Sequence, residues 1–387
     1  MRLGLTPEGN KQAHQDAKLI NHGIRQVGWN RDNFISNSPW ASSCSRKRAV
    51  GRFLVSMRTK FFNLLFVWTL LLLSGCGGGG GGTSSSSGTY TATPSVFINS
   101  STIGMSLGFL RQMTFNGGYL YFVDSDLSDF GSVGHVYKVN AAGTSASFVT
   151  APNGTSTSMK WVYSVAVAAD GSVLASGTDT TELAPGVINL SYRKTTVISA
   201  PTNSYGIAID TSNSMLYISD TGGSGNTVVR YNISSATSPT QIGLSPTFVT
   251  VASNPQGLAY DSAGYVYVTT NTGGSDGVYR ISTSTFTSTL FASSATLFKN
   301  PIGIAVRSSP KEIYVINKGT TDTNSNVLKI SSDGATITKF LDGADASSML
   351  CAPIGAAING NILYISNGTC TANSTYAKSV IKVTLDN

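Results

Sequence analysis

A repeated pattern of apolar runs constrains the fold of this 387-residue chain more than any other feature. Each copy has two apolar runs of four or five residues, separated by a polar or glycine turn, as in YGIAIDTSNSMLYISD from Tyr205. Short apolar runs on either side of a turn predict a β-hairpin. Six copies begin at Arg111, Tyr163, Tyr205, Gln256, Ile302 and Ile354, with spacings of 42 to 52 residues. Repeats of this length match one blade of a β-propeller.

A third apolar run follows each hairpin and contains one basic residue. These residues are Lys138, Arg193, Arg230, Arg280, Lys329 and Lys382. The first five copies continue into a fourth run, and the sixth lacks one, but SVFINS at Ser95–Ser100 has the matching pattern and no partner before it. We therefore predict an all-β fold: a six-bladed β-propeller of four-stranded blades, whose last blade is closed by the N-terminal strand.

The repeat resembles a known family. Its G-[IL]-A start, its YISD or YVIN second strand and the Asp220…Asn226…Arg230 spacing resemble NHL repeats and the wider group of six-bladed propellers that contains gluconolactonase and streptogramin lyase. The resemblance covers residues 91–387. It implies the architecture strongly and the activity weakly, because one propeller shape carries binding modules and several unrelated enzymes.

Residues 57–76 resemble a bacterial lipoprotein signal peptide. Arg58 and Lys60 precede the apolar run Phe61–Leu73, which is too short to span a bilayer comfortably, and the sequence LSGC ends at Cys76. The resemblance implies that Cys76 is acylated and becomes the first residue of the mature protein. The alternative is a short buried helix with a chance cysteine.

The chain therefore divides into four predicted segments. Residues 1–56 are either a misassigned upstream extension or a genuine cytoplasmic one, 57–76 are the signal peptide, 77–89 a Gly/Ser linker and 90–387 the propeller. This organisation predicts an exported lipoprotein that contacts the membrane through its lipid anchor only. By resemblance, Gly77 in place of the aspartate that retains lipoproteins at the inner membrane predicts the outer membrane.

Charge is distributed unevenly along the chain. The net charge of +7 comes from residues 1–76, which hold eleven basic and three acidic residues, whereas the remainder holds fifteen basic and sixteen acidic. A neutral body with scattered basic residues argues against nucleic acid as a partner. After residue 76 the only histidine is His135, and the only glutamates are Glu182 and Glu312. Because the usual general bases are so scarce, we expect a binding module rather than an enzyme.

The residue before each repeat's glycine, or its equivalent, is predicted to lie at the mouth of a central channel. These positions are Arg111 or Gln112, Tyr163, Tyr205, Gln256, Ile302 and Ile354. Metal-dependent lactonases of the resembled group hold a divalent cation with Asn and Asp at matching positions, and the lyases depend on a channel histidine. These positions offer neither Asn nor a carboxylate, and His135 precedes a third-strand pattern. We therefore predict no catalytic residue, no metal and no cofactor.

Aromatic and amide side chains dominate this predicted mouth. Flat rings with hydrogen-bonding edges suit a protein, peptide or saccharide ligand. We therefore predict ligand binding by Arg111, Trp161, Tyr163, Tyr205 and Gln256, although packing between blades also accounts for some of these aromatics. The sequence thus predicts a ligand- or protein-binding module at the bacterial cell envelope. The alternative is a degenerate or unusual propeller enzyme of the gluconolactonase or streptogramin-lyase type.

Two further sets of residues carry a prediction. Cys351 and Cys370 lie in two loops of one propeller face, so in an oxidising compartment we expect a disulfide, the alternative being two free buried thiols. Short polar residues end the second strands, and we expect them to bond turn backbone rather than a metal ion. They are Asp124, Thr178, Asp220, Asn271, Asn317 and Asn367.

Overall fold

A computed structural model describes most of the chain after residue 91. The described residues are 92–125, 134–149, 159–179, 185–190, 204–222, 226–233, 240–241, 248–271, 276–371 and 374–386. The predicted signal peptide, Cys76 and the Gly/Ser linker lie outside them. Within the described ranges no helix is long and apolar enough to span a membrane.

The first half of the described chain forms three antiparallel sheets. The first contains β2 (Leu110–Asn116), β3 (Tyr119–Asp124), β4 (His135–Asn140) and β5 (Ala146–Phe148). The second contains β6 (Met159–Val167), β7 (Val173–Asp179) and β8 (Pro185–Asn189). The third contains β9 (Ser204–Asp210), β10 (Met215–Asp220), β11 (Thr227–Asn232), β12 (Thr240–Gln241) and β13 (Phe248–Thr250).

The second half repeats the same hairpin order. The fourth sheet contains β14 (Pro255–Tyr260), β15 (Tyr265–Thr270), β16 (Gly277–Ser282) and β17 (Ser288–Ser293). The fifth contains β18 (Pro301–Ser308), β19 (Lys311–Asn317), β20 (Asn326–Ser331) and β21 (Ile337–Asp342). The sixth contains β22 (Pro353–Asn359), β23 (Ile362–Asn367), β24 (Val380–Thr384) and β1 (Pro94–Ile98). The helical segments are α2 (Ser100–Ile103), η1 (Asp322–Asn324), η2 (Ala346–Ser348) and η3 (Ser374–Tyr376).

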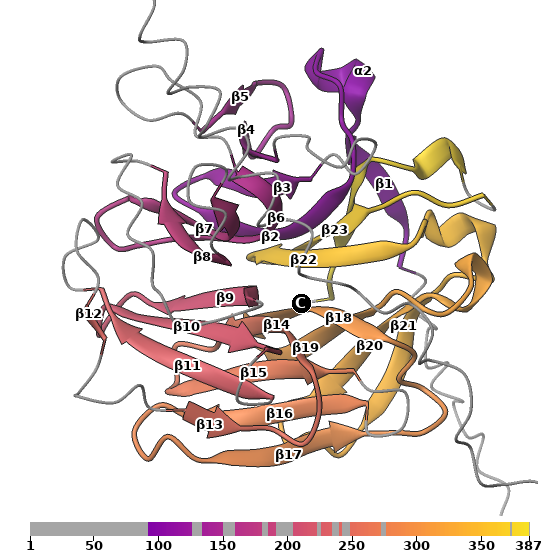
Figure 1. The fold of residues 1–387 in the computed structure, drawn as a ribbon. Helices are drawn as coiled ribbons and strands as arrows, with labels where there is room; N and C mark the ends of the chain where they lie inside the picture. Colours follow the sequence, from indigo (N-terminus) through magenta and orange to yellow (C-terminus); the bar gives the residue numbers. More distant parts are fainter. Residues whose placement is uncertain are drawn as a thin grey trace, which may run out of the picture. The chain divides into compact units, whose positions relative to one another are not determined.

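The first strand of each sheet faces a common centre. These inner strands contact one another in chain order, β2 with β6, β6 with β9, β9 with β14, β14 with β18 and β18 with β22, and β22 contacts β2 again. The sheets are therefore arranged in a closed ring (Figure 1). Buried apolar clusters lie between neighbouring sheets, as where Ile207 and Ile218 of the third sheet pack with Leu174 and Val187 of the second.

The last sheet takes its outer strand from the start of the propeller. β1 pairs antiparallel with β24, with Pro94 opposite Val383 and Val96 opposite Ile381. Figure 1 shows the indigo strand β1 beside the yellow C-terminal strands. This pairing confirms that the N-terminal strand closes the last blade.

The all-β propeller with four-stranded blades is confirmed, but the number of complete blades is five rather than the predicted six. Five sheets contain four or more strands, and the sheet β6–β8 contains three in the described residues. The predicted fourth strand of that sheet, TTVIS from Thr195, lies outside them. The third sheet has one strand more than predicted, because the separate strands β12 and β13 both pair with β11.

The basic residue of the third strand lies opposite a buried tyrosine in five sheets. The pairs are Tyr121 with Lys138, Tyr217 with Arg230, Tyr267 with Arg280, Tyr314 with Lys329, and Tyr364 with Lys382. These cations also lie over nearby rings: Lys138 Nζ is 3.9 Å from the centre of the Tyr119 ring, and Arg230 Cζ is 4.3 Å from that of Phe286. In four of these sheets the repeated basic residue therefore serves packing through cation–π contacts, whereas Lys329 Nζ forms an ion pair with Glu312 Oε1 at 2.6 Å.

The second sheet departs from this pattern, and one sequence expectation there is wrong. The basic-residue rule places its third strand at SYRK around Arg193, but the third strand observed is β8, which ends at Asn189. Ala175 stands in β7 where the other sheets have tyrosine. Because β7 has no buried tyrosine ring, the third strand β8 needs no basic residue opposite it, and an apolar run forms this strand instead.

The repeated glycine lets neighbouring inner strands approach closely. A Cβ atom on Gly303 would lie 2.3 Å from the carbonyl oxygen of Ile354 in the next sheet. Gly206, Gly257 and Gly355 make equally close approaches, to the carbonyl oxygens of Gln256, Ile302 and Arg111. The G-[IL]-A signature is therefore a packing requirement of the ring, and it carries no information about activity.

Candidate functional site at the N-terminal mouth of the channel

The six predicted mouth positions lie where the inner strands begin, and we call this end of the channel the N-terminal mouth. Each inner strand has an irregular register with its neighbour at this point, for example between Leu110 and Met113 in β2 and between Lys160 and Ser164 in β6. The other four inner strands show the same interruption. β-Bulges of this kind re-aim side chains at the rims of β structures. The backbone thus presents the mouth residues differently from a regular strand.

Hydroxyl groups hold several mouth residues in place. Ser366 Oγ donates to the carbonyl oxygen of Arg111 at 2.7 Å, and Ser219 Oγ donates to that of Gln256 at 2.7 Å. Equivalent bonds join Thr269 to Ile302 at 3.1 Å and Ser176 to Tyr205 at 3.3 Å. Each bond runs from the second strand of one sheet to the inner strand of the next. The mouth is therefore built on the rigid junctions between sheets.

Arg111 is the centre of an aromatic cluster at this mouth. Its Cζ atom lies 4.7 Å from the centre of the Tyr163 ring and 5.1 Å from that of Phe109. Its Nε donates to Ser125 Oγ at 2.9 Å. The Tyr163 and Tyr205 rings lie 4.9 Å apart at an interplanar angle of 50°. The guanidinium is thus fixed by one hydrogen bond and two ring faces.

No carboxylate neutralises this guanidinium in the described part of the chain. The ion pairs found there involve Arg307, Lys311, Lys329 and Lys339. Burial lowers the pKa of Arg111 from its ordinary value, and the nearby Tyr163 and Tyr205 phenols partly offset this effect. An arginine remains protonated at neutral pH even so. Among the described residues, the Arg111 guanidinium therefore has no acidic partner.

Tyr163 remains a neutral hydrogen-bond donor in this cluster. Burial raises the pKa of its hydroxyl, an effect that Arg111 opposes and Tyr205 reinforces. The phenol therefore stays protonated throughout the neutral pH range. Together with Arg111 it makes the N-terminal mouth a site rich in donors.

Trp161 and Gln256 belong to the mouth but not to the Arg111 cluster. Trp161 lies in the bulge of β6, has a left-handed φ of 48° and is 44% exposed. For a bulky residue such a φ marks a strained position, and strain of this kind collects at functional sites. Gln256 is half-buried in β14, and its backbone oxygen takes the bond from Ser219. The structure thus brings Arg111, Tyr163 and Tyr205 together and leaves Trp161 exposed beside them in sequence.

Gln112 forms the floor of the mouth. It occupies the position that is glycine in four other copies, and its side chain crosses to other inner strands. Its Nε2 lies 3.1 Å from the carbonyl oxygen of Ile302 and 3.5 Å from that of Ile354. A cavity of about 270 Å³ begins at Gln112 and runs along the inner strands toward their hairpins. Gln112 lines this cavity, whereas Arg111, Tyr163, Tyr205, Gln256, Ile302 and Ile354 do not.

The cavity beyond Gln112 is uncharged. Its polar lining residues include Thr114, Asn116 and Tyr260, and no charged side chain lines it among the residues that the structure describes. Burial, with a further contribution from the nearby Asp210 carboxylate, raises the pKa of Tyr260 to about 12. The only strong electrostatic feature of the channel described is therefore Arg111 at the N-terminal mouth.

The polar residues at the ends of the second strands bond backbone groups. Asp124 accepts from the amides of Gly108 and Phe109 at 2.8 and 2.7 Å. Asn367 donates to the carbonyl oxygens of Met349 and Tyr376 at 2.9 and 3.1 Å. Within the described ranges, no group of three or more His, Cys, Asp or Glu side chains is placed to hold a metal ion. These contacts support the structural interpretation of the polar residues.

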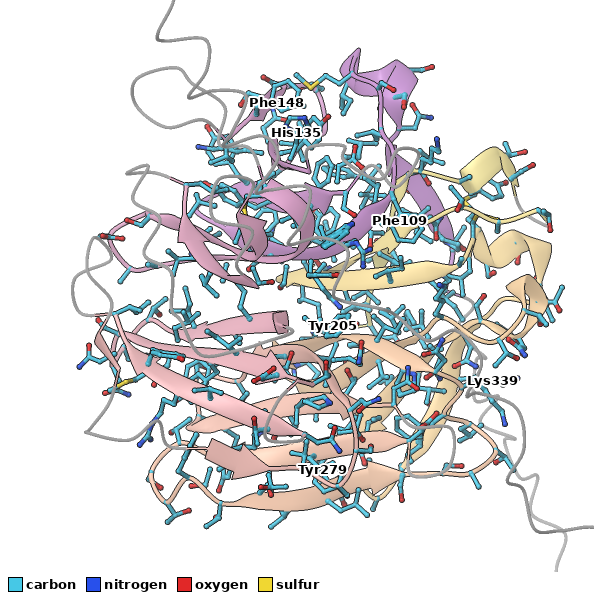
Figure 2. All side chains as sticks on the ribbon, in the orientation of Figure 1. Phe109, His135, Phe148, Tyr205, Tyr279 and Lys339 are labelled. Atoms are coloured by element: carbon cyan, nitrogen blue, oxygen red, sulfur yellow. A yellow bond between two sulfur atoms is a disulfide. The ribbon has the colours of Figure 1, made fainter. Side chains whose placement is uncertain are left out.

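His135 does not take part in the mouth. It begins β4, a third strand, and its ring centre lies 5.0 Å from that of the exposed Phe148. Figure 2 shows these two side chains together at the upper margin of the propeller, whereas Tyr205 lies near its middle. A channel histidine of the lyase kind is therefore not supplied by His135.

A disulfide borders the same mouth. Cys351 and Cys370 are bonded, with their Cα atoms 5.4 Å apart. The amide of Gly368 donates to the carbonyl oxygen of Cys351 at 3.0 Å, and a Cβ atom on Gly368 would lie 3.5 Å from the Phe109 ring. The disulfide thus fixes a loop against one of the two rings that flank Arg111.

Three residues of the candidate site escaped the sequence analysis in whole or in part. Phe109 precedes the first repeat and Ser125 follows its second strand, so neither occupies a repeated position. Gln112 appeared only as an alternative to Arg111. Its signal was available, because a long amide at a position that is otherwise glycine must extend into the channel.

Comparisons with known proteins agree on the architecture. No model of a known protein family matches the chain, and no curated protein matches it. Among solved structures, it is similar to the PQQ-bound form of an aldose sugar dehydrogenase from Streptomyces coelicolor, with a TM-score of 0.54 and 15% identity over 76% of this chain and 98% of that one. A gluconolactonase from Xanthomonas campestris gives 0.52 and 12% over 76% and 90%. An auxiliary nutrient binding protein from Bacteroides thetaiotaomicron gives 0.45 and 10% over 72% and 69%.

At these identities the likeness concerns the fold alone. The two structures with TM-scores above 0.5 support a β-propeller as the scaffold of this chain. The chemistry of the N-terminal mouth rests on its own residues.

Proposed function

We propose that this chain is an exported, lipid-anchored, NHL-like propeller that binds a ligand or protein partner at the bacterial cell envelope through its N-terminal mouth. The lipid anchor is Cys76, and the linker 77–89 holds the propeller away from the membrane. Binding rather than catalysis is the conclusion that the geometry of the mouth supports best.

One observation carries the proposal. Arg111 lies over the Phe109 and Tyr163 rings, with one hydrogen bond to Ser125 and no acidic partner in the described structure. A buried charge without a counter-ion costs free energy. The ring contacts and the bulged strand hold this charge at a mouth rather than in a closed core. Such a costly arrangement is explained when a ligand supplies the missing partner.

The same surroundings argue against the enzymatic alternative. A general base is absent from the Arg111 cluster as described, since its members are arginine, phenylalanine, tyrosine and serine. These groups bind and orient, and none of them is a metal ligand of the kind a hydrolytic cation requires. The alternative enzyme would need ligands or bases from other parts of the chain.

The binding proposal is tested by the molecules that co-purify with the full-length protein. Wild-type protein and an Arg111→Gln variant are released from the native envelope in detergent, and mass spectrometry compares their bound small molecules and proteins. The matched control is Lys339→Gln, which removes one charge from an exposed outer strand, where Lys339 pairs with Asp342. We expect a partner that is retained by wild type and Lys339→Gln and lost by Arg111→Gln. Identical profiles for all three proteins would contradict the proposal.

The anchor is tested separately. Cys76→Ser should release the protein from membranes and abolish incorporation of labelled fatty acid. A variant that still sediments with the envelope, beside a wild type that takes up no label, would show that the anchor assignment is wrong. The binding proposal would stand in that case, because it depends on the propeller alone.

Metal dependence separates binding from the enzymatic alternative. Elemental analysis of protein purified without chelator should find no stoichiometric divalent cation, and EDTA should change neither the melting temperature nor ligand retention. A bound metal would add stability of order RT ln(1 + [L]/Kd) that chelation removes. Metal-dependent hydrolysis of a panel of lactones would replace the binding module with the gluconolactonase-type enzyme.

A further inference from the structure

From the proposed function and the donors at the N-terminal mouth, we infer that the ligand carries a carboxylate on a flat ring, and that Arg111 binds this carboxylate. The inference deepens the proposed function by naming the chemical class of the ligand. It rests on three properties of the mouth: its unused donors, its single charge and its floor.

The unused donors of Arg111 have the geometry of a carboxylate site. A guanidinium has five N–H donors, and only the Nε–H of Arg111 has a partner, Ser125 Oγ at 2.9 Å. The two terminal amino groups are left with four donors that no described residue accepts. Their parallel N–H bonds match the two oxygens of a carboxylate in a bidentate pair. Ser125 fixes the rotation of the guanidinium, so the fork is held in one orientation before the ligand arrives.

The charge at the mouth matches a monovalent anion. Arg111 supplies one positive charge, and the groups that act on it electrostatically are the phenols of Tyr163 and Tyr205. A carboxylate carries one negative charge and neutralises the guanidinium completely. A phosphate monoester carries about 1.5 to 2 negative charges near neutral pH, so part of its charge would stay unpaired in this half-buried site. The balance of charge with Arg111 therefore favours a carboxylate over a phosphate.

The rings around Arg111 define what the carboxylate is attached to. Arg111 Cζ lies over the Phe109 and Tyr163 rings, and the Tyr205 ring centre lies 4.9 Å from that of Tyr163. A flat ring attached to a carboxylate on Arg111 would therefore lie beside the tyrosine rings. Aromatic side chains pack well against other flat rings. The Tyr163 and Tyr205 hydroxyls are available as polar groups at the edge of such a ring.

The floor of the mouth fixes the direction in which the ligand extends. Gln112 crosses the channel one residue below Arg111 and bonds the carbonyl oxygens of Ile302 and Ile354. The inference therefore places the remainder of the ligand on the outer side of Gln112, away from the cavity. The protein thus recognises the acidic end of a molecule whose other end remains accessible.

Isothermal titration calorimetry on the full-length protein in detergent tests the inference with defined probes. Benzoate and glucuronate carry the carboxylate on an aromatic and on a pyranose ring, and so distinguish the two kinds of ring. Benzamide and glucose are their uncharged controls, and inorganic phosphate is the competing anion. We expect benzoate to bind about tenfold or more tightly than benzamide, as for hydrogen bonds to a charged group. Benzoate should also bind more tightly than glucuronate, because the pyranose ring of glucuronate is puckered rather than flat. Phosphate should bind more weakly than the better carboxylate.

Three variants locate the effect at Arg111. Arg111→Gln should weaken carboxylate binding by about tenfold to a hundredfold, and Arg111→Lys should recover only part of the loss, because an ammonium keeps the charge without the planar fork. Lys339→Gln should bind as wild type does. A urea midpoint for each variant verifies that it is folded, and Arg111→Lys remains informative if Arg111→Gln does not fold.

Several results would overturn the inference. They are equal affinity for benzoate and benzamide, tighter binding of glucuronate than of benzoate, tighter binding of phosphate than of benzoate, or benzoate affinity unchanged in both Arg111 variants. Its failure is distinguishable from failure of the proposed function. If the molecule lost from the Arg111→Gln protein in the co-purification experiment contains no carboxylate, the mouth binds a ligand but the assigned class is wrong.

Discussion

Ring closure by the N-terminal strand makes a quantitative prediction at Ile98. This residue ends β1, is 0% exposed and packs with Leu107, Leu110 and Leu120 at the start of the propeller and with Tyr364 near its end. It therefore joins the first and last sheets of the ring. Replacing Ile98 with alanine removes this contact without shortening the strand or changing the backbone bonds to β24.

The magnitude follows from burial. Each buried carbon group contributes about 0.8 kcal/mol, so the three carbons lost in Ile98→Ala account for about 2.4 kcal/mol. The cavity left between two sheets adds to this figure, because each sheet is held in place by its own hydrogen bonds. We expect a total loss of about 3 to 4 kcal/mol, within the range of about 2 to 5 kcal/mol for such substitutions.

Urea unfolding followed by circular dichroism measures the effect. Ser95→Ala on the same strand is the matched control, because Ser95 is exposed and its substitution should change the free energy of unfolding by less than about 0.5 kcal/mol. A loss below about 1 kcal/mol in Ile98→Ala, or an equal loss in both variants, would refute the reasoning that β1 holds the ring closed.

Three further predictions concern stability and pH. Replacing both Cys351 and Cys370 with serine should cost about 3 kcal/mol in urea unfolding, as expected for a closed loop of about twenty residues, and an unchanged midpoint would show that the disulfide does not constrain the unfolded chain. Burial alone would raise the pKa of Glu312, but hydrogen bonds from Lys329, Tyr314 and Arg307 hold it below its usual value. The Glu312 carboxylate therefore stabilises the fold above its unfolded pKa of about 4.3, and this stabilisation is lost as pH falls through the lower folded value. The stability deficit of Glu312→Gln should accordingly be present at pH 7 and shrink in acid, whereas a pH-independent deficit would contradict the argument. Because burial raises the pKa of Tyr163, benzoate affinity measured by calorimetry should stay constant between about pH 6 and about pH 9, and a fall within that range would show that a mouth group ionises there.

The architecture could be predicted from the sequence because the repeated residues meet requirements of backbone packing that recur in each sheet. The glycine before each Ile, Leu or Ala permits the close approach of the next inner strand, and a Cβ on Gly303 would lie 2.3 Å from a carbonyl oxygen. The tyrosine of the second strand and the basic residue of the third strand likewise recur, because they lie opposite each other in five of the sheets, as Tyr217 and Arg230 do. These constraints recur in each sheet, and a single sequence displays them several times.

The second and third sheets show where the repeat misleads. Arg193 fits the basic-residue rule, but the third strand lies earlier, because Ala175 replaces the tyrosine that the cation would accompany. In the third sheet β12 and β13 divide the outer edge between them, which a single apolar run at TFVTV does not indicate. Pattern matching cannot detect such changes, since it assumes that each copy has the same partners.

The candidate site was only partly predictable, because some of its residues lie outside the repeated positions. Phe109 and Ser125 lie outside the repeated positions, so no aligned counterpart drew attention to them. Arg111, Tyr163 and Tyr205 were found because they occupy aligned positions, and the structure brings their side chains together. Gln256 occupies an equivalent position but lies outside this cluster. Which of the aligned residues meet is determined by the three-dimensional arrangement of the sheets.

Hydrogen–deuterium exchange tests the central claim, ligand binding at the N-terminal mouth, most directly. Full-length protein released from the native envelope is compared before and after its bound ligand is removed by extensive dialysis. The account predicts that the ligand slows exchange at the starts of β2, β6 and β9, which carry Arg111, Tyr163 and Tyr205, and leaves the β2–β3 hairpin unchanged. Protection at the hairpin ends of the inner strands, or no difference between the two samples, would contradict it.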